Sequence, residues 1–311
     1  MSSNDGNIVD PFHLFHSVPV SGGNLAVAQA GPSTVQADAV VLAIHGITGN
    51  MIIWRTVARN LDALGGVSFL APDLRGRGES AALPGPYGIA SHVKDMLGVL
   101  DHFGVGRAVL AGHSMGAYLA ARLAAEHPER VAGLVLVDGG PSVDALTPEQ
   151  AGAVRAVTVG PALVRHAMSM PSEEAWLEFW HQHPAFAHAW NGDVEAYVLH
   201  DVGGEPGAIG YVINLNAVET DSNEMLSDPA NRTPMDRVDV PLTLLRAPRG
   251  TFDDDHPLVS TPALRAFVSA HPAAEVEEVE GVNHYTVILG DSPGPARVAA
   301  AIENTVRVPS G

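Results

Sequence analysis

Short apolar runs alternate with helical patterns along most of the chain. Uninterrupted apolar runs are typical of strands that are buried on both faces of a parallel sheet. The predicted strands occupy residues 39–44, 67–72, 109–111, 131–137, 242–245 and 275–279, after a hairpin at 13–20 and 25–30. Helical patterns cover 51–64, 89–103, 261–270 and 295–306, and another ends near residue 127. The alternation predicts an α/β fold with a mostly parallel central sheet flanked by helices.

The alternation stops between residues 139 and 236. This segment has helical patterns, many prolines and three of the four tryptophans, at positions 176, 180 and 190. Its place inside an otherwise regular α/β pattern indicates an insertion. We therefore predict a core domain formed by residues 1–138 and 237–311, with a mainly helical cap at 139–236 inserted after the sixth strand.

The chain carries a formal net charge of −18 and contains no cysteine. The negative charge argues against binding to nucleic acid or to an anionic membrane. The lack of cysteine excludes disulfides, thiolate metal sites and cysteine nucleophiles. Residues 1–7 are polar, and no apolar run is long enough to span a bilayer. We therefore expect a cytoplasmic protein, a monomer or homodimer, whose partner is a small molecule.

The pattern Gly-x-Ser-x-Gly at residues 112–116 lies between an apolar strand and an alanine-rich helix pattern. This is the context of a nucleophile elbow, in which a sharp turn holds a serine at its tip. Gly112 and Gly116 have no Cβ, so the strand and the helix can approach closely. Ser114 is therefore the candidate nucleophile.

A serine hydroxyl needs a base, and the base needs an orienting acid. His284 follows the last predicted strand, which puts it at the same sheet edge as Ser114. Asp253 is the preferred acid because it lies in the loop after the preceding strand. Its neighbours Asp254 and Asp255 are alternatives, and Asp138, directly after the strand at 131–137, is another.

Backbone N–H groups can stabilise the oxyanion that forms when a serine attacks a carbonyl. Met115 opens the helix after Ser114, and Ile47 lies in the His-Gly loop after the strand at 39–44. We expect these two amides to form the oxyanion hole. The histidines and aspartates of the cap show no helix-spaced set of metal ligands, and no dinucleotide or phosphate-loop pattern is present. No cofactor and no metal are therefore expected.

Taken together, these segments resemble the α/β-hydrolase-fold serine hydrolases of the carboxylesterase and lipase type. The matching segments are His-Gly-Ile-Thr-Gly at 45–49, Asp-Leu-Arg-Gly-Arg-Gly-Glu-Ser at 73–80, Gly-His-Ser-Met-Gly at 112–116, the Asp253 loop and Asn-His at 283–284. The resemblance covers nearly all of residues 20–308, least in the cap, and implies a triad of Ser114, Asp253 and His284. One departure matters. The family usually has a short Gly-x-x-Asp turn after the strand at 242–245. The segment is longer here, so it stays open which aspartate is the acid of the triad.

The resemblance implies an ester hydrolase that works through an acyl-enzyme. The aromatic and apolar side chains of the cap suggest a small to medium hydrophobic substrate. Candidate substrate contacts are His113, Met168, Trp176, Trp180 and Tyr285.

Two arginines of the cap, Arg155 and Arg165, could instead bind a substrate carboxylate. The same triad is compatible with a carbon–carbon bond hydrolase of diketo ring-cleavage products. It is also compatible with a cofactor-free haloperoxidase or perhydrolase. The non-enzyme alternative is a ligand receptor on this fold. Epoxide hydrolases and haloalkane dehalogenases carry aspartate at the nucleophile position, so Ser114 argues against both.

Overall fold

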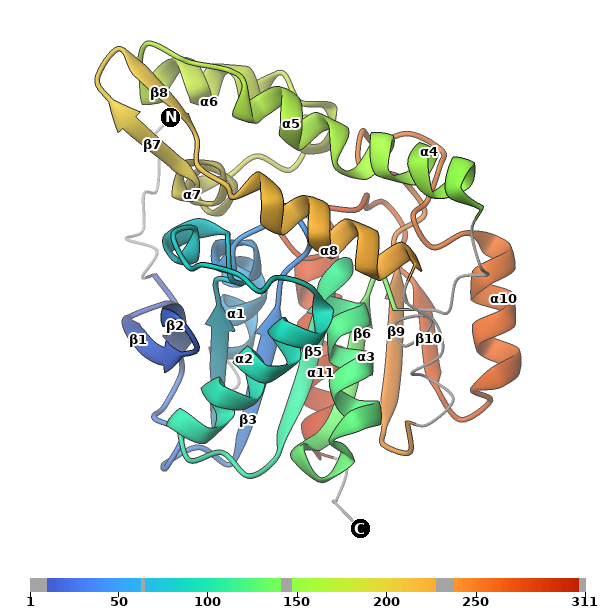
Figure 1. Ribbon diagram of the computed structural model, residues 1–311. Coiled ribbons are helices and arrows are strands. Elements are labelled where there is room, and N and C mark those ends of the chain that lie inside the picture. The colour runs from blue at the N-terminus through green and yellow to red at the C-terminus, as the bar shows by residue number, and fades with distance from the viewer. Residues whose placement is uncertain (1–9, 63–64, 141–146, 228–237, 308–311) are drawn as a thin grey trace, which may run out of the picture.

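The computed structural model describes residues 10–62, 65–140, 147–227 and 238–307 (Figure 1). The main sheet of this described part has the strand order β1-β2-β4-β3-β5-β6-β9-β10. Its strands are β1 (Leu14–Val20), β2 (Gly23–Ala30), β3 (Ala39–Ile44), β4 (Val67–Pro72), β5 (Ala108–His113), β6 (Val131–Val137), β9 (Leu242–Arg246) and β10 (Glu275–Glu278).

The β1–β2 hairpin and the β2–β4 pair are antiparallel, whereas all other neighbours in the main sheet are parallel. The side chains of β5 are all buried, as the apolar run predicts for a central parallel strand. The carboxyl ends of parallel strands lie at one edge of a sheet, so the loops after β3, β5, β6 and β9 meet there. The predicted fold class is confirmed.

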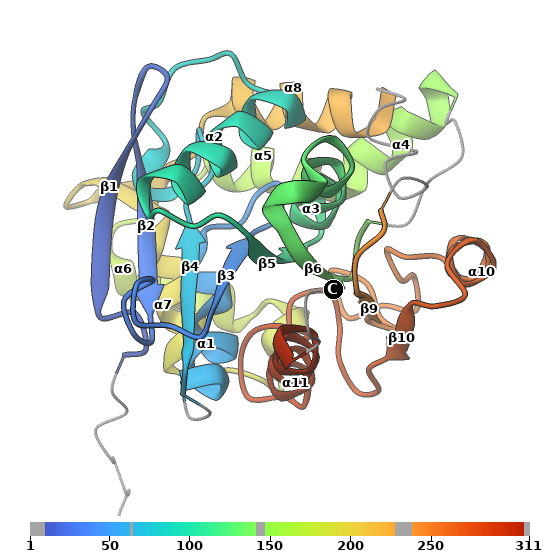
Figure 2. The same ribbon diagram turned by 90° about the horizontal axis from the view of Figure 1, so that it is seen from below.

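Helices cover both faces of the sheet, as Figure 2 shows from below. On one face, α1 (Arg55–Asp62) packs against α11 (Gly294–Arg307). On the other face, α2 (Ile89–His102) packs against α3 (Met115–Glu126), and α3 also contacts β5 and β6. α10 (Thr261–Ala270) lies beside the β10 edge.

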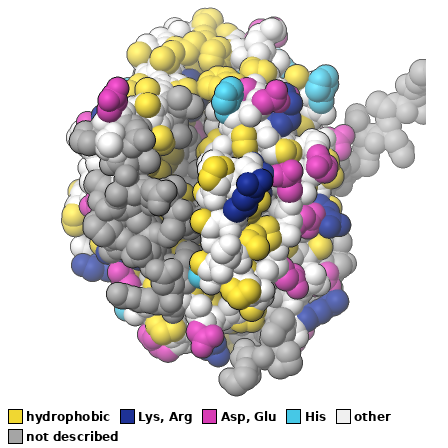
Figure 3. Space-filling model, turned by 90° about the vertical axis from the view of Figure 1, so that its right-hand side faces the viewer, with side chains coloured by type: hydrophobic (Ala, Val, Ile, Leu, Met, Phe, Trp, Pro, Cys, Tyr) yellow, Lys and Arg dark blue, Asp and Glu magenta, His cyan; other side chains and the backbone are white. Residues whose placement is uncertain are grey.

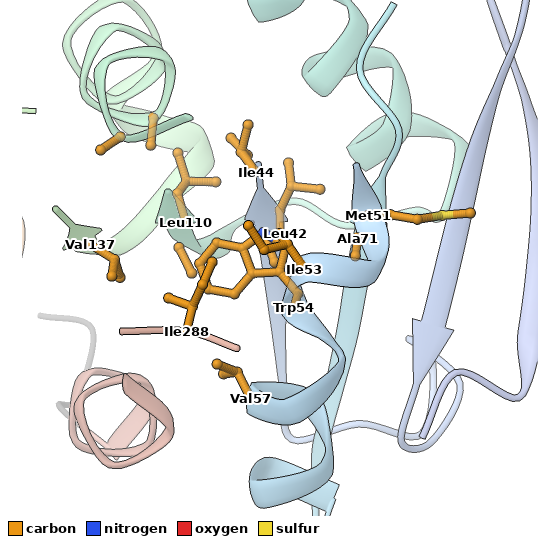
Figure 4. Close-up of a cluster of buried hydrophobic side chains, with 14 of the residues drawn as sticks. Leu42, Ile44, Met51, Ile53, Trp54, Val57, Ala71, Leu110, Val137 and Ile288 are labelled. Atoms are coloured by element: carbon orange, nitrogen blue, oxygen red, sulfur yellow. The ribbon is translucent and has the colours of Figure 1, made fainter. Parts of the chain in front are cut away.

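Trp54 fills the centre of the core on the α1 side and is fully buried. Figure 4 shows its indole among Leu42, Leu110 and Ile288, which come from two strands and the segment before α11. The sequence pattern predicted one helix over residues 51–64. The structure instead has a 3-10 turn, η1 (Met51–Trp54), before α1, and residues 63–64 lie outside the described part.

The segment between β6 and β9, here called the cap, lies over the carboxyl ends of the parallel strands (Figure 1). Its described elements are α4 (Pro148–Thr158), α5 (Gly160–His166), α6 (Glu173–His181), η4 (Pro184–Phe186), α7 (Gly192–His200), β7 (Val202–Glu205), β8 (Ala208–Tyr211) and α8 (Leu215–Ser227). The insertion after the sixth strand is as predicted, but its predicted end at 236 lies outside the described residues. The β7–β8 hairpin was not foreseen, because both strands are short and rich in glycine.

Acidic, basic and apolar side chains are interspersed on the face of the molecule shown in Figure 3. Within the described residues, no helix combines the length and the apolar character needed to cross a bilayer.

Asp73, at the carboxyl end of β4, ties the cap to the core. Its buried carboxylate accepts hydrogen bonds from the amides of Met51 (2.7 Å) and Glu79 (2.9 Å) and from His200 Nε2 at the end of α7 (2.8 Å). Burial opposes protonation of His200, but the hydrogen bond to Asp73 and the charges of Asp73 and Asp201 raise its pKa to about 9. His200 is therefore a cation at neutral pH and forms a charged bond between cap and core.

A second buried link runs from Arg77 to the cap. Its guanidinium forms an ion pair with Asp221 of α8, and Asp221 also accepts a hydrogen bond from His92 Nε2 (2.9 Å) and from the Gly88 amide (2.7 Å). Burial acts to raise the pKa of Asp221. The charges of His92 and Arg77 and these hydrogen bonds outweigh burial and hold the pKa below its ordinary value, so the carboxyl stays ionised. Both charged links between core and cap therefore start from the segment that follows β4.

Replacing His200 with Gln keeps a hydrogen-bond donor but removes the charge. Because the folded pKa of about 9 lies above the ordinary value of 6.5, the stabilisation is complete below pH 6.5 and is lost as the pH rises through 9. We expect the free energy of unfolding of His200→Gln to fall short of wild type by on the order of 2–3 kcal/mol near pH 6. The difference in the free energy of unfolding between wild type and His200→Gln should be small at about pH 9.5. Denaturant unfolding at both pH values tests this, and a gap that does not depend on pH would contradict it.

Gly116 must be glycine for steric reasons, since a Cβ there would lie 2.1 Å from the backbone oxygen of Ile44. We expect Gly116→Ala to destabilise the protein by ~3 kcal/mol or more, because strand and helix must separate. Gly152 of α4 is the matched control, because a Cβ there meets no atom within 4 Å. Gly152→Ala should stabilise by ~0.5–1 kcal/mol through helix propensity. Thermal unfolding of both variants tests the pair, and equal effects would refute the steric argument.

Candidate active site

Ser114 occupies the sharp turn between β5 and α3. Its backbone angles are φ 56° and ψ −122°, in a region that residues other than glycine rarely adopt. The turn is held by hydrogen bonds from the Ser114 amide to the Val137 oxygen and from the Ala117 amide to the Ser114 oxygen, both 3.0 Å. A Cβ at Gly112 would lie 2.4 Å from the Gly116 oxygen, so the strand and helix approach as closely as the motif predicted. The turn therefore projects Ser114 beyond the sheet edge.

His284 lies in the turns between β10 and α11, and it lines the same cavity as Ser114. Its Nδ1 is 2.7 Å from Oδ2 of Asp138, which follows β6 directly. The other Asp138 oxygen accepts a hydrogen bond from the Ala247 amide (3.1 Å). An ionised carboxylate only accepts hydrogen bonds, so this contact puts the imidazole proton on Nδ1 and leaves Nε2 as the basic nitrogen.

The prediction of Asp253 as the partner of His284 is wrong. Asp253 instead forms an ion pair with Arg249 (2.8 Å) and accepts a hydrogen bond from Asn283 Nδ2 (3.3 Å). Arg249 binds the Asp253 carboxylate within the loop that carries both residues. Asp138, which follows the strand next to β9, contacts His284 directly.

The two other candidate acids of that loop also bind elsewhere. Asp254 accepts a hydrogen bond from the His256 amide (2.9 Å), and Asp255 pairs with Arg249 (3.0 Å). Of the four aspartates considered, the one directly after β6 contacts His284.

The amides of Ile47 and Met115 are the predicted donors of an oxyanion hole. Ile47 lines the cavity with Ser114, and Met115 is the first residue of α3, where a helix amide has no intrahelical partner. Neither amide donates a hydrogen bond to another group in the described part of the chain. A Cβ at Gly46 would lie 3.0 Å from the Ser114 Cβ, so the His-Gly loop packs directly against the nucleophile turn. The predicted pair of donors therefore stays a prediction that the geometry supports.

Arg77 holds the loop that carries Ile47. This side chain is fully buried, and its Nε donates to the Ile47 carbonyl oxygen (3.0 Å). Because the same guanidinium pairs with Asp221 of the cap, one arginine connects α8 to the loop beside Ser114. The sequence pattern offered only the Arg-Gly-Arg-Gly segment as a signal for this role.

Two further histidines near Ser114 are neutral. Burial lowers the pKa of His45 to about 4, and His45 Nε2 accepts from the Leu74 amide (2.9 Å). Burial and the charge of His284 lower the pKa of His113 well below its ordinary value. The His113 ring lies 4.5 Å from the His284 ring, and its Nε2 donates to the His284 carbonyl oxygen (2.8 Å). These contacts fix the backbone and the ring of His284 without competing for a proton.

The cavity at Ser114 has a volume of about 40 Å³. Its lining comes from the loops at the sheet edge and from the cap: Gly46, Ile47, Thr48, Gly49, Ile53, His113, Ser114, Tyr197, Thr251, Leu258, His284 and Tyr285. Pockets for drug-sized ligands measure roughly 300–1,000 Å³. A substrate of more than a few heavy atoms therefore requires side chains of the cavity wall to move.

Of the five predicted substrate contacts, His113 and Tyr285 line this cavity, whereas Met168, Trp176 and Trp180 do not. Trp176 is fully buried in the cap, where its Nε1 donates to the Val198 oxygen (2.8 Å). Aromatic side chains of the cap can thus pack within the cap, and the sequence does not distinguish such packing from a pocket lining.

Thr251 and Leu258 are lining residues that the sequence analysis missed. They belong to the long loop after β9, which has no periodic pattern to show which side chains face inward. Asn283 was also missed. Its Oδ1 accepts from the Tyr285 and Thr286 amides (both 3.0 Å), so it shapes the turn that carries His284. Among the described residues, no cluster of side chains could hold a metal ion.

Comparison with known proteins agrees with this architecture. The profile of the alpha/beta hydrolase fold family matches residues 39–193. Lipase LipV of Mycobacterium tuberculosis is 39% identical over 121 residues, which are 39% of this chain and 44% of that protein. Epoxide hydrolase 2 of Siraitia grosvenorii is 34% identical over 121 residues, which are 38% of this chain and 36% of that protein. Both matches thus span less than half of the relative's length.

Among solved structures, E-2-(acetamidomethylene)succinate hydrolase has a TM-score of 0.76 at 20% identity, covering 94% of this chain and 98% of that one. This likeness concerns the fold. The family profile, the strand order and the strained turn at Ser114 together show that this chain belongs to the α/β-hydrolase fold family.

Proposed function

We propose that this protein is a serine hydrolase that cleaves carboxylic esters through a triad of Ser114, His284 and Asp138. The observation that carries the proposal is the buried contact between Asp138 and His284, because His284 lines the same cavity as Ser114. A match to a protein named as a lipase agrees with an ester substrate.

In the proposed reaction, His284 Nε2 takes the proton of the Ser114 hydroxyl while Oγ attacks the ester carbonyl carbon. Negative charge develops on the carbonyl oxygen, which the Ile47 and Met115 amides stabilise. Asp138 stabilises the positive imidazolium through Nδ1–H. The carbon–oxygen bond to the alcohol then breaks, and His284 gives its proton to the departing oxygen.

The second half of the reaction mirrors the first. His284 Nε2 removes a proton from a water molecule, whose oxygen attacks the acyl-enzyme carbonyl. Ser114 leaves as the alcohol, taking the proton from His284, and the carboxylic acid is released. No cofactor or metal takes part in this proposed cycle.

The small cavity supports a short acyl group beside Ser114. The apolar side chains of Ile53 and Leu258 and the two tyrosines Tyr197 and Tyr285 contribute to its wall. A wall that excludes water from the cavity strengthens the hydrogen bonds that stabilise the oxyanion. The carbon–carbon hydrolase and perhydrolase alternatives share this triad, so activity on aryl esters, vinylogous diketo acids and peroxide separates them.

Ser114→Ala should reduce kcat for 4-nitrophenyl acetate by on the order of 10³-fold or more, because the nucleophile is lost while the oxyanion donors stay. Release of 4-nitrophenol, after subtraction of the uncatalysed rate, measures the effect. Labelling of wild type, but not of Ser114→Ala, by a fluorophosphonate identifies the reactive group. Wild-type protein that neither turns over esters nor reacts with the fluorophosphonate would favour a ligand receptor instead.

Asp138→Asn and Asp253→Asn form a matched pair that tests the identity of the acid. Asp138→Asn should lower kcat by on the order of 10³–10⁴-fold, because the amide no longer holds the reactive tautomer of His284. Asp253→Asn should stay within about threefold of wild type, since it disturbs a partly exposed ion pair and one long hydrogen bond from Asn283 (3.3 Å). Thermal unfolding of both variants controls for folding. A larger loss in Asp253→Asn than in Asp138→Asn would overturn the assignment.

A further inference from the structure

Arg165 of α5 is a buried cation in the cap. Its exposed fraction is 6%, and its Nε has no hydrogen-bond partner. No carboxylate of the described residues lies within ion-pair distance of this guanidinium. Burying an arginine without a counter-ion is costly, so such an arginine is uncommon without a functional reason.

Aromatic rings hold the Arg165 guanidinium in place. Its Cζ lies 5.1 Å from the Trp180 ring centroid and 5.3 Å from that of Tyr211, within the range of cation–π attraction. The two rings fix the position of the charge, but neither ring carries an anionic group that would neutralise it. Trp180 therefore supports the arginine and does not line the cavity at Ser114.

Tyr211 connects Arg165 to the candidate active site. The Tyr211 hydroxyl donates to the Thr48 oxygen (2.8 Å), and Thr48 lines the cavity with Ser114. Burial opposes protonation of Arg165, but its interactions with Tyr285, Tyr211 and Tyr197 raise its pKa, so the side chain stays charged. Tyr197 and Tyr285 both line the cavity. The cation is thus linked to the cavity wall through Tyr211 and interacts with the lining residues Tyr197 and Tyr285.

Asp201 is the acidic group of the cap that faces this cluster, and it does not neutralise Arg165. Its carboxylate accepts a hydrogen bond from Asn50 Nδ2 (2.6 Å). Burial raises the pKa of Asp201 to about 7, against the charges of His200 and Arg165, so it is partly protonated near neutral pH. The charge of Arg165 also contributes, after burial, to a lowered pKa of about 4 for His183, so this neighbour is neutral.

Arg155 makes a useful comparison because it lies on the preceding helix, α4. It is exposed and donates to the side-chain oxygen of Asn223. An exposed arginine of this kind is solvated and needs no other partner. Only one of the two arginines considered from the sequence therefore has the burial expected of a binding group.

We propose that Arg165 binds a carboxylate of the substrate, so that the protein acts on half-esters of short dicarboxylic acids. This specificity rests on the proposed ester hydrolysis at Ser114. A carboxylate that enters past Tyr197 and Tyr285 supplies the counter-ion that the guanidinium lacks and an acceptor for its Nε–H. Arg165 then orients the other end of the acyl chain, with its ester carbonyl at Ser114 and the Ile47 and Met115 amides.

The test uses two esters with the same chain, monomethyl glutarate and methyl pentanoate, in which a methyl group replaces the carboxylate. Wild type should have a kcat/KM at least about tenfold higher for monomethyl glutarate, because a charge-assisted hydrogen bond forms with that ester alone. In Arg165→Gln, the loss should be at least about tenfold greater for monomethyl glutarate than for methyl pentanoate. Arg165→Lys should fall between wild type and Arg165→Gln. Arg155→Gln is the matched control and should behave as wild type with both esters.

A binding measurement separates this proposal from the hydrolytic one. In a Ser114→Ala background, calorimetric titration with glutarate should give a Kd at least about tenfold weaker when Arg165→Gln is added. This result supports the carboxylate site even if neither ester is hydrolysed. Equal glutarate affinity with and without Arg165 overturns the proposal, as do equal losses on both esters. If Arg165→Gln does not fold in a thermal unfolding control, the same comparisons are made with Arg165→Lys.

Discussion

The hydrogen bond between Asp138 and His284 is the interaction on which the candidate active site depends. Asp138 follows one strand and His284 follows another, so the bond forms only when the parallel sheet is complete. It fixes the proton on Nδ1 and thereby decides which nitrogen can act as a base. The strained turn at Ser114 then brings a hydroxyl to the same cavity. The chemistry proposed above is a consequence of where three strands of one sheet end.

The cap adds a second layer of constraint. His200 pairs with Asp73 and Arg77 pairs with Asp221, so charged groups of the segment after β4 join the core to the cap. Arg77 also binds the Ile47 carbonyl, which couples the position of the cap to the loop that would form the oxyanion hole. Within the cap, the aromatic rings around Arg165 hold a charge near the cavity without neutralising it. The core supplies the candidate reactive groups, and the cap contributes Tyr197 to the cavity wall.

Much of the core could be predicted from the sequence, because buried parallel strands leave uninterrupted apolar runs. The strands β3, β4 and β6 begin and end where the pattern placed them, and the Gly-x-Ser-x-Gly turn lies between β5 and α3. Ser114 and His284 line one cavity for the same reason: strand order fixes the edge at which their loops lie.

The acid and the cap contacts could not be predicted in this way. Asp253 had the expected place in the chain, but Arg249 of its own loop binds it, and a sequence pattern does not show such a local ion pair. Trp176 and Trp180 were candidate substrate contacts because they are apolar side chains of the cap, yet both are buried in packing within the cap. Patterns report burial, whereas the choice between a core and a pocket depends on tertiary contacts.

The central claim is that Ser114, His284 and Asp138 act as one unit beside the amides of Ile47 and Met115. A crystal structure of the protein after reaction with a fluorophosphonate tests this most directly. The account predicts a phosphorus bonded to Ser114 Oγ, with one phosphoryl oxygen about 3 Å from both amides. It also predicts that His284 still contacts Asp138 through Nδ1. A phosphonylated residue other than Ser114, or a His284 ring turned to Asp253, would contradict it.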